Sequence, residues 1–201
     1  GSASGSRATI VMPSGSGKTV AGLRVAEAMG AKTVVVLVPS LELVTQSYMD
    51  WERWRALDGP LAGWRPLAVC SSSSVPAAVL PRTTSPDDIA AFLRDGDAAA
   101  GSSIIFGTYH SAKRISEALS SLGPQPSSAI DLLICDEAHR CTGSLKKRDA
   151  QPLNDAFLPA TKRLFLTATP KLIGSKRDAD GGLVEAGSMD DEAYFGPMVF
   201  R

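Results

Sequence analysis

Six consecutive apolar or β-branched residues at positions 33–38 constrain the fold of this chain more than any other segment. The run shows no alternation of polar and apolar side chains, so a strand formed there would be buried on both faces. Strands of that kind occur in parallel sheets that helices cover on both sides. The run therefore predicts an α/β fold.

Similar strand-like runs alternate with helical patterns along the rest of the chain. Strands are predicted at residues 8–12, 33–38, 67–70, 103–107, 130–135 and 163–167, and helices at residues 18–29, 41–54, 86–94 and 111–122. Strands that alternate with helices of about 10–15 residues are typical of βαβ units. We therefore expect a three-layer α/β domain with a mainly parallel central sheet.

Length and composition bound the domain and its setting. With 201 residues, the chain is long enough for one domain with a sizeable core and short for two. Residues 1–6, rich in Gly, Ser and Ala, are interpreted as a cloning remnant and linker, which leaves residues 7–201 as the folded domain. No apolar run reaches the roughly 18 residues of a membrane span, and no signal peptide is expected. Three cysteines in no zinc-binding spacing argue against a disulfide framework and a zinc site, and favour a reducing, cytoplasmic setting.

A glycine-rich segment lies where the first predicted strand meets the first predicted helix. The residues expected to cradle phosphate groups are Pro13, Ser14, Gly15, Ser16, Gly17, Lys18 and Thr19. Backbone N–H groups there can bind phosphate oxygens, Lys18 can reach the β- and γ-phosphates, and the Thr19 hydroxyl can ligate Mg²⁺. Met12 stands where the strict phosphate-loop pattern has its first glycine. The alternative is a Ser/Gly surface loop that contains Lys-Thr by chance.

A pair of acidic residues ends the predicted strand at residues 130–135. Asp136 at a strand end suits a second contact to Mg²⁺, directly or through water. Glu137 suits the base that orients and polarises an attacking water. These assignments would make Lys18, Asp136 and Glu137 the catalytic residues. The alternative is two acids that cap the next helix.

The acidic pair carries a resemblance to a known family. Asp-Glu-Ala-His at residues 136–139 resembles motif II of the DEAH-type superfamily 2 helicases and translocases. Residues 38–46, 107–111 and 166–170 are similar to motifs Ia, Ib and III, and follow in the family's order. The resemblance implies the first RecA-like motor domain, a P-loop NTPase fold that uses ATP and Mg²⁺.

The same resemblance implies roles for residues outside the nucleotide site. Contacts to a nucleic-acid backbone are implied for Pro39, Ser40, Gln46, Thr108 and Tyr109. Coupling between nucleotide and nucleic acid is implied for His139, Thr167 and Thr169. Ser40 also suits a plain helix N-cap, and both roles can hold. Trp51 and Trp54 lie three residues apart and are expected to pack in the core rather than to stack on bases.

The partner of the domain is less clearly indicated. Lys and Arg total 21, as do Asp and Glu, so the zero net charge gives no whole-chain signature of nucleic-acid binding, although a local basic patch remains compatible with it. Residues 188–196 resemble an acidic-aromatic-glycine element near type I and type III restriction motor subunits, which favours DNA over RNA. A solvated acidic turn is the alternative for this element.

The family hydrolyses ATP between two RecA-like domains, and the second is expected elsewhere in the same full-length chain. We therefore expect these 201 residues to bind Mg-nucleotide but to hydrolyse it poorly. Two alternatives remain: a non-hydrolysing nucleotide-gated scaffold module and a P-loop kinase that acts on a small molecule.

Overall fold

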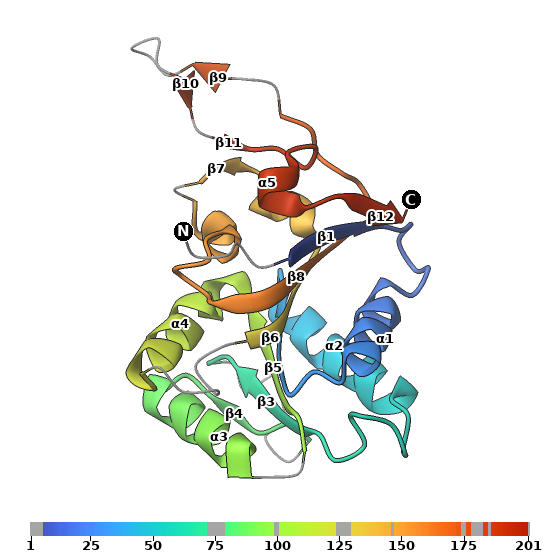
Figure 1. Ribbon diagram of the computed structural model, residues 1–201, viewed down its shortest axis with the longest axis vertical. Helices are drawn as coiled ribbons and strands as arrows, with labels where there is room; N and C mark the ends of the chain where they lie inside the picture. The colour runs from blue at the N-terminus through green and yellow to red at the C-terminus, as the bar shows by residue number, and fades with distance from the viewer. Residues whose placement is uncertain are drawn as a thin grey trace.

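A parallel sheet forms the centre of the computed structural model, which describes residues 6–71, 79–98, 101–123, 130–145, 147–173, 176–177, 183–184 and 186–200 (Figure 1). Within these residues the sheet has eight strands in the order β12-β1-β8-β6-β2-β5-β3-β4, and every neighbouring pair is parallel. The strands are β1 Ser6–Val11, β2 Thr33–Val38, β3 Arg65–Val69, β4 Arg82–Thr83, β5 Ser103–Thr108, β6 Ile130–Asp136, β8 Ala160–Thr167 and β12 Met198–Phe200. The predicted fold class is confirmed.

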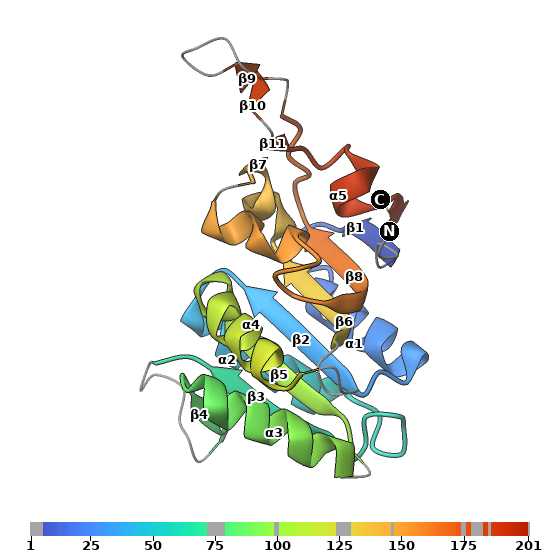
Figure 2. The same cartoon turned by 60° about the vertical axis from the view of Figure 1, so that its left-hand side comes forward.

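Two pairs of helices cover the two faces of the sheet (Figure 2). Helices α1 Lys18–Met29 and α2 Leu41–Trp54 pack on one face, and α3 Pro86–Ala98 and α4 Ala112–Ser121 on the other. Strand β2 supplies alternate side chains to both hydrophobic cores: Val34 and Val36 to the first, Val35 and Leu37 to the second. The unbroken apolar run is therefore explained by burial on both sides.

Short elements complete the fold. They are the 3₁₀ turns Tyr109–Ser111, Ala138–Cys141 and Arg148–Leu153, the helix α5 Glu192–Phe195, and two antiparallel pairs: β7 Gly143–Ser144 with β11 Ala186–Gly187, and β9 Lys176–Arg177 with β10 Leu183–Val184. No helix in the described residues has the length and apolar character needed to cross a membrane.

Three sequence predictions need correction. Ser6 was assigned to the linker, but it is the first residue of β1 and is paired with Lys162 of β8. The helix predicted to end near residue 94 continues to Ala98. Trp51 is buried as expected, whereas Trp54, at the last position of α2, keeps 47% of its surface exposed.

Candidate functional site

The loop between β1 and α1 has the backbone shape of a phosphate-binding loop. Gly15 and Gly17 have φ angles of 77° and 92°, a left-handed conformation that glycine adopts without the steric cost of a side chain. Ser16 closes a tight turn, because its backbone N–H and its hydroxyl both donate to the Pro13 carbonyl, at 3.2 and 2.6 Å. The chain then enters α1 at Lys18, where the N–H groups of the first helical turn have no partners within the helix.

Met12 does not distort this loop. Its backbone N–H donates to the Thr167 carbonyl at 3.0 Å, which continues the pairing of β1 with β8. Among the described residues, Glu137 is the one non-glycine residue with a left-handed φ, so Met12 adopts an ordinary backbone conformation. The backbone at position 12 therefore does not require glycine.

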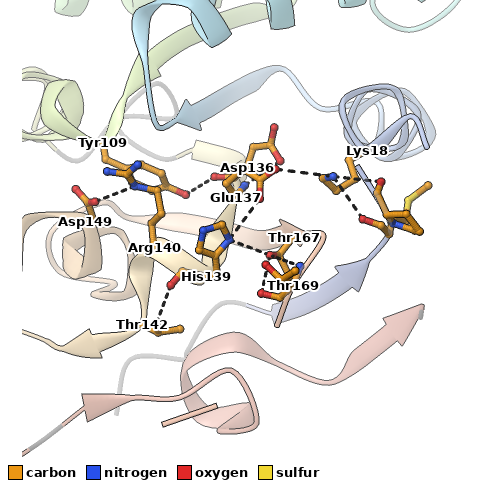
Figure 3. Close-up of polar contacts among 12 residues, drawn as sticks. Lys18, Tyr109, Asp136, Glu137, His139, Arg140, Thr142, Asp149, Thr167 and Thr169 are labelled. Atoms are coloured by element: carbon orange, nitrogen blue, oxygen red, sulfur yellow. Dashed lines mark hydrogen bonds and ion pairs between the residues drawn. The ribbon is translucent and has the colours of Figure 1, made fainter. Parts of the chain in front are cut away.

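The Lys18 side chain is held inside the loop and faces the acidic pair (Figure 3). Its ammonium lies 3.4 Å from each of the carbonyl oxygens of Met12 and Pro13, and 3.8 Å from Glu137 Oε1. Only 8% of Lys18 is exposed. The cation is thus held at the mouth of the loop, where phosphate oxygens would meet it.

Asp136 and Glu137 stand at the carboxyl end of β6, opposite Lys18. Burial raises the pKa of the Asp136 carboxyl, and the charge of Glu137 raises it further, while its hydrogen bond from the Glu137 N–H and the charge of Lys18 act in the opposite direction. Glu137 has a φ of 50°, a conformation that costs on the order of 1–3 kcal/mol in a non-glycine residue. A buried charge next to backbone strain is typical of a functional site.

A cavity of about 640 Å³ joins the loop to the acidic pair, a size within the usual range of small-molecule sites. It is lined by Ser14, Gly15, Ser16, Gly17, Lys18, Thr19, Val20, Leu43, Gln46, Asp50, Trp54, Asp136 and Glu137. All the residues predicted to bind nucleotide therefore meet here except Pro13, which is exposed beside the cavity. One wall of the cavity is a face of α2 that the sequence reading missed, although positions 43, 46, 50 and 54 have helical spacing.

Gln46 belongs to that wall. The sequence assigned it to nucleic-acid binding with Pro39 and Ser40, and the structure instead places it in the cavity of the phosphate loop, apart from those two residues, so a contact with nucleic acid stays a prediction. The reason is its position in the second turn of α2, which turns its side chain away from the residues that begin the helix.

The three residues assigned to coupling lie together beside Glu137. His139 Nδ1 is 3.2 Å from the Thr167 hydroxyl and 3.3 Å from Glu137 Oε2. The Thr167 hydroxyl also accepts a hydrogen bond from the Thr169 N–H at 3.2 Å. Figure 3 shows this chain of contacts, which connects the end of β8 to the acidic pair.

A second cavity, a groove of about 690 Å³, opens at the carboxyl ends of β2, β3 and β5. Its lining residues are Pro39, Ser40, Leu41, Glu42, Val69, Cys70, Ser71, Thr84, Thr108, His110, Ser111 and Arg114. Pro39, Ser40 and Thr108 were predicted to contact nucleic acid, whereas His110, Ser111 and Arg114 were not singled out. Ser40 also caps α2, since its hydroxyl accepts from the Leu43 N–H at 3.5 Å.

Tyr109 does not line this groove. Its side chain is 2% exposed, and its hydroxyl donates to the Asp136 carbonyl at 2.7 Å. Burial raises the pKa of the phenol well above its usual value, so the hydroxyl stays protonated and can donate. The Tyr109 side chain is therefore turned away from the groove, and a contact of residue 109 with nucleic acid stays a prediction for its backbone alone.

Comparisons with known proteins were made for the whole chain. A family model described as "Type III restriction enzyme, res subunit" matches residues 3–172. No curated protein matches significantly. Among solved structures, a nuclease-deletion mutant of the Type ISP restriction-modification enzyme LlaGI, in complex with a DNA substrate mimic, is similar with a TM-score of 0.77 and 30% identity, covering 97% of this chain and 15% of that one.

Two further structures are similar. The ATP-dependent Type ISP restriction-modification enzyme LlaBIII bound to DNA has a TM-score of 0.76 and 29% identity, with 97% of this chain and 14% of that chain covered. The Hef helicase domain of Pyrococcus furiosus shares the fold, with a TM-score of 0.59 and 20% identity. The match covers 98% of this chain and 35% of that chain. This chain thus spans about 15% of the length of the first of these relatives. Because the family model matches most of the chain, the protein belongs to the family of the type III restriction enzyme res subunit, and its fold is that of a superfamily 2 RecA-like motor domain.

Proposed function

We propose that this chain is the ATP-binding motor domain of an ATP-dependent helicase or translocase that acts on DNA. The observation that carries the proposal is the cavity in which the phosphate loop, Lys18, Asp136 and Glu137 meet. Two relatives support it: LlaBIII is described as ATP-dependent and bound to DNA, and LlaGI is in complex with a DNA substrate mimic.

The donor set of the cavity suits Mg²⁺. Thr19 and Asp136 offer a hydroxyl and a carboxylate, and hard oxygen donors are the ligands that Mg²⁺ prefers. In the described residues no group of three or more His, Cys, Asp or Glu side chains is placed to hold a metal. A few protein ligands suffice for Mg²⁺ because substrate phosphates and water complete its shell. When bound, Mg²⁺ would neutralise phosphate charge.

Hydrolysis then follows from the side chains that face one another. Glu137 accepts a proton from a water molecule as the water oxygen bonds to the γ-phosphorus. The bond to the β,γ-bridging oxygen breaks, and its electron pair leaves with ADP. Lys18, held at the loop carbonyls, compensates the charge on the phosphate oxygens. In this scheme His139, Thr167 and Thr169 transmit the state of the Glu137 carboxylate to the end of β8.

DNA would lie in the groove at the carboxyl ends of β2, β3 and β5, where α2 and α4 begin. Its lining offers hydroxyl groups from Ser40, Thr108 and Ser111, which can bind phosphate oxygens, and two basic side chains, His110 and Arg114. Because the Glu42 carboxylate also lines the groove, the hydroxyl groups and Arg114 would hold the DNA phosphates individually rather than through a net positive charge.

Efficient turnover requires a part of the full-length enzyme beyond this domain. We propose that the domain begins at Ser6, the first residue of β1, and that a second RecA-like domain supplies an arginine to the γ-phosphate. Such an arginine raises phosphoryl-transfer rates by about 10³–10⁵. The isolated chain should therefore bind Mg-nucleotide and hydrolyse it slowly. The three cysteines are buried and unpaired, which suits a reducing, cytoplasmic setting.

Binding of a fluorescent ATP analogue tests the proposal. Lys18→Ala should abolish Mg-dependent binding, because it removes the cation at the mouth of the loop. Lys32→Ala is the matched control, since Lys32 is exposed and lies at the amino end of β2, whereas the cavity lies at the carboxyl ends of the strands. Equal binding by all three proteins would overturn the assignment of the phosphate loop, and absence of binding by the wild type would overturn nucleotide binding by this domain.

A further inference from the structure

We infer that Tyr109 is a positioning residue that links the proposed DNA groove to the acidic end of β6, so that binding at either site changes affinity at the other. This inference rests on the proposed function. Tyr109 and Asp136 are joined by a dashed line in Figure 3, which shows the contact directly.

On the groove side, Tyr109 is fixed to two lining residues. Thr108 and His110 flank it in the chain, and both line the groove, whereas the Tyr109 side chain points into the core. The Thr108 hydroxyl is 3.1 Å from that of Ser111, which also lines the groove. A ligand that draws on these hydroxyls and on His110 therefore acts on the short 3₁₀ turn that carries Tyr109.

On the nucleotide side, Tyr109 holds one end of a single peptide group. Its hydroxyl donates to the Asp136 carbonyl at 2.7 Å, and the N–H of the same peptide, from Glu137, donates to Asp136 Oδ1 at 2.9 Å. Because a peptide group is planar, these two bonds together fix its orientation. The peptide joins Asp136 and Glu137, whose side chains both line the nucleotide cavity, and its N–H holds the Asp136 carboxylate directly.

The link is stiff because it is buried. Tyr109 belongs to the same buried core as Ala112, Ile115 and Ala138, where water cannot replace the Asp136 carbonyl as a hydrogen-bond partner if the carbonyl turns away. The strained φ of Glu137 shows that the peptide is held by its surroundings rather than by its own preference. The link is distinct from the contact of His139 with Thr167, which approaches Glu137 through its side chain.

Reciprocal binding measurements test the inference. The affinity for a fluorescent Mg-ATP analogue is measured with and without a saturating short DNA duplex, for the wild type and for Tyr109→Phe. We expect the duplex to change wild-type nucleotide affinity by about 5-fold or more, the lower end of typical coupling. In Tyr109→Phe the duplex should change the nucleotide affinity by less than about 2-fold. The variant should still bind each ligand when the other is absent.

Thr9→Val is the matched control. Thr9 also donates a buried hydroxyl hydrogen bond to a backbone carbonyl, that of Phe195 at 2.8 Å, on a strand that carries neither the groove nor the acidic pair. It should lose stability comparably and keep wild-type coupling. Wild-type coupling in Tyr109→Phe, or no coupling in the wild type, would overturn the inference. Failure of the wild type to bind nucleotide would overturn the proposed function and this inference with it.

A second measurement applies if Tyr109→Phe does not fold. The chain has three tyrosines, so the wild type labelled with 3-fluorotyrosine gives three ¹⁹F resonances, and Tyr48→Phe and Tyr194→Phe identify that of Tyr109 by elimination. We expect the DNA duplex alone and Mg-nucleotide alone each to shift this resonance. A Tyr109 resonance that responds to only one of the two ligands would contradict a shared link.

Discussion

Glu137 Oε1 lies 3.8 Å from Lys18 Nζ, so the carboxylate proposed as the base faces the cation proposed to hold the phosphates. In the proposed mechanism the γ-phosphate of a bound nucleotide would replace Glu137 as the partner of Lys18, and the carboxylate would then be left to orient water. The two residues therefore make separable contributions, one to binding and one to the chemical step.

Glu137→Gln should separate the two in the full-length enzyme. We expect DNA-stimulated ATP turnover to fall by about 10²–10⁴, the usual contribution of a general base, while nucleotide affinity is retained or rises because a negative charge near the phosphates is removed. Steady-state turnover and equilibrium binding measure the two effects. Glu192→Gln, at an exposed acid at the start of α5, should leave both unchanged. Unchanged turnover in Glu137→Gln would rule out this residue as the base.

Asp136→Asn should stabilise the chain in Mg²⁺-free buffer at neutral pH. Burial raises the pKa of Asp136, so the folded state binds this proton more tightly than the unfolded state does. The stabilisation from the protonated carboxyl is present at low pH and is lost as the pH rises through the folded-state pKa. A neutral amide avoids this, and each kcal/mol gained corresponds to roughly 2–4 °C in Tm for a chain of this size. Thermal unfolding in EDTA measures the shift, with the exposed Asp190→Asn as the control. A lower Tm for Asp136→Asn would contradict the prediction.

Trp54 should report nucleotide binding through its fluorescence. It lines the nucleotide cavity and is 47% exposed, whereas Trp51 and Trp64 are 1% and 9% exposed. We expect Mg-ATP to change the intrinsic emission of the wild type, and Trp54→Phe to lose most of that change. Trp64→Phe should keep it. A response that persists in Trp54→Phe would mean that the nucleotide does not reach this wall of the cavity.

Arg114→Ala should weaken DNA binding in a salt-dependent way. The logarithm of the DNA-binding constant falls linearly with the logarithm of the salt concentration, and removing one cation that neutralises a DNA phosphate makes this slope less steep by about 1. Arg24→Ala is a close control: both arginines lie on helices, both pair with a glutamate three residues later, and their side chains are 55% and 51% exposed. Arg24 lies on α1, on the opposite face of the sheet from α4. Equal slopes for the two variants would show that Arg114 does not bind a phosphate.

Much of this fold could be predicted because local patterns and tertiary packing agree. The run in β2 requires burial on both faces, and the helices on both sides provide it. The bounds predicted for β2, α1 and α2 are those observed. The extension of α3 beyond Arg94 could not be foreseen, because Asp and Gly in its last turn favour a loop on local preference alone.

Side-chain directions at the site were harder to predict. Tyr109 and Gln46 were assigned by resemblance to motifs Ib and Ia, which does not give side-chain directions; one points into the core and the other lines the nucleotide cavity. Helical spacing did group Trp51 with Trp54, yet Trp54 lines the open nucleotide cavity while Trp51 is buried in the core.

Charged residues in the core gave no signal at all. Arg163 is 1% exposed within β8, where it contacts Asp155 and donates to the Pro152 carbonyl at 3.2 Å. Arg7 of β1 reaches the same carboxylate at 2.9 Å. The pairing of Arg7 with Asp155, 148 residues apart, is known only once the strands are assembled.

The place of β1 between β8 and β12 has a consequence for synthesis on the ribosome. The strand that carries the phosphate loop is the first to be made, yet both of its partners in the sheet, residues 160–167 and 198–200, are made last. Strands β2, β5 and β6 can pair with one another before then. Since pairing between distant segments is slow, the nascent chain should carry its phosphate loop unanchored until the end of the domain emerges. Nucleotide binding would thus mark completed synthesis of this domain.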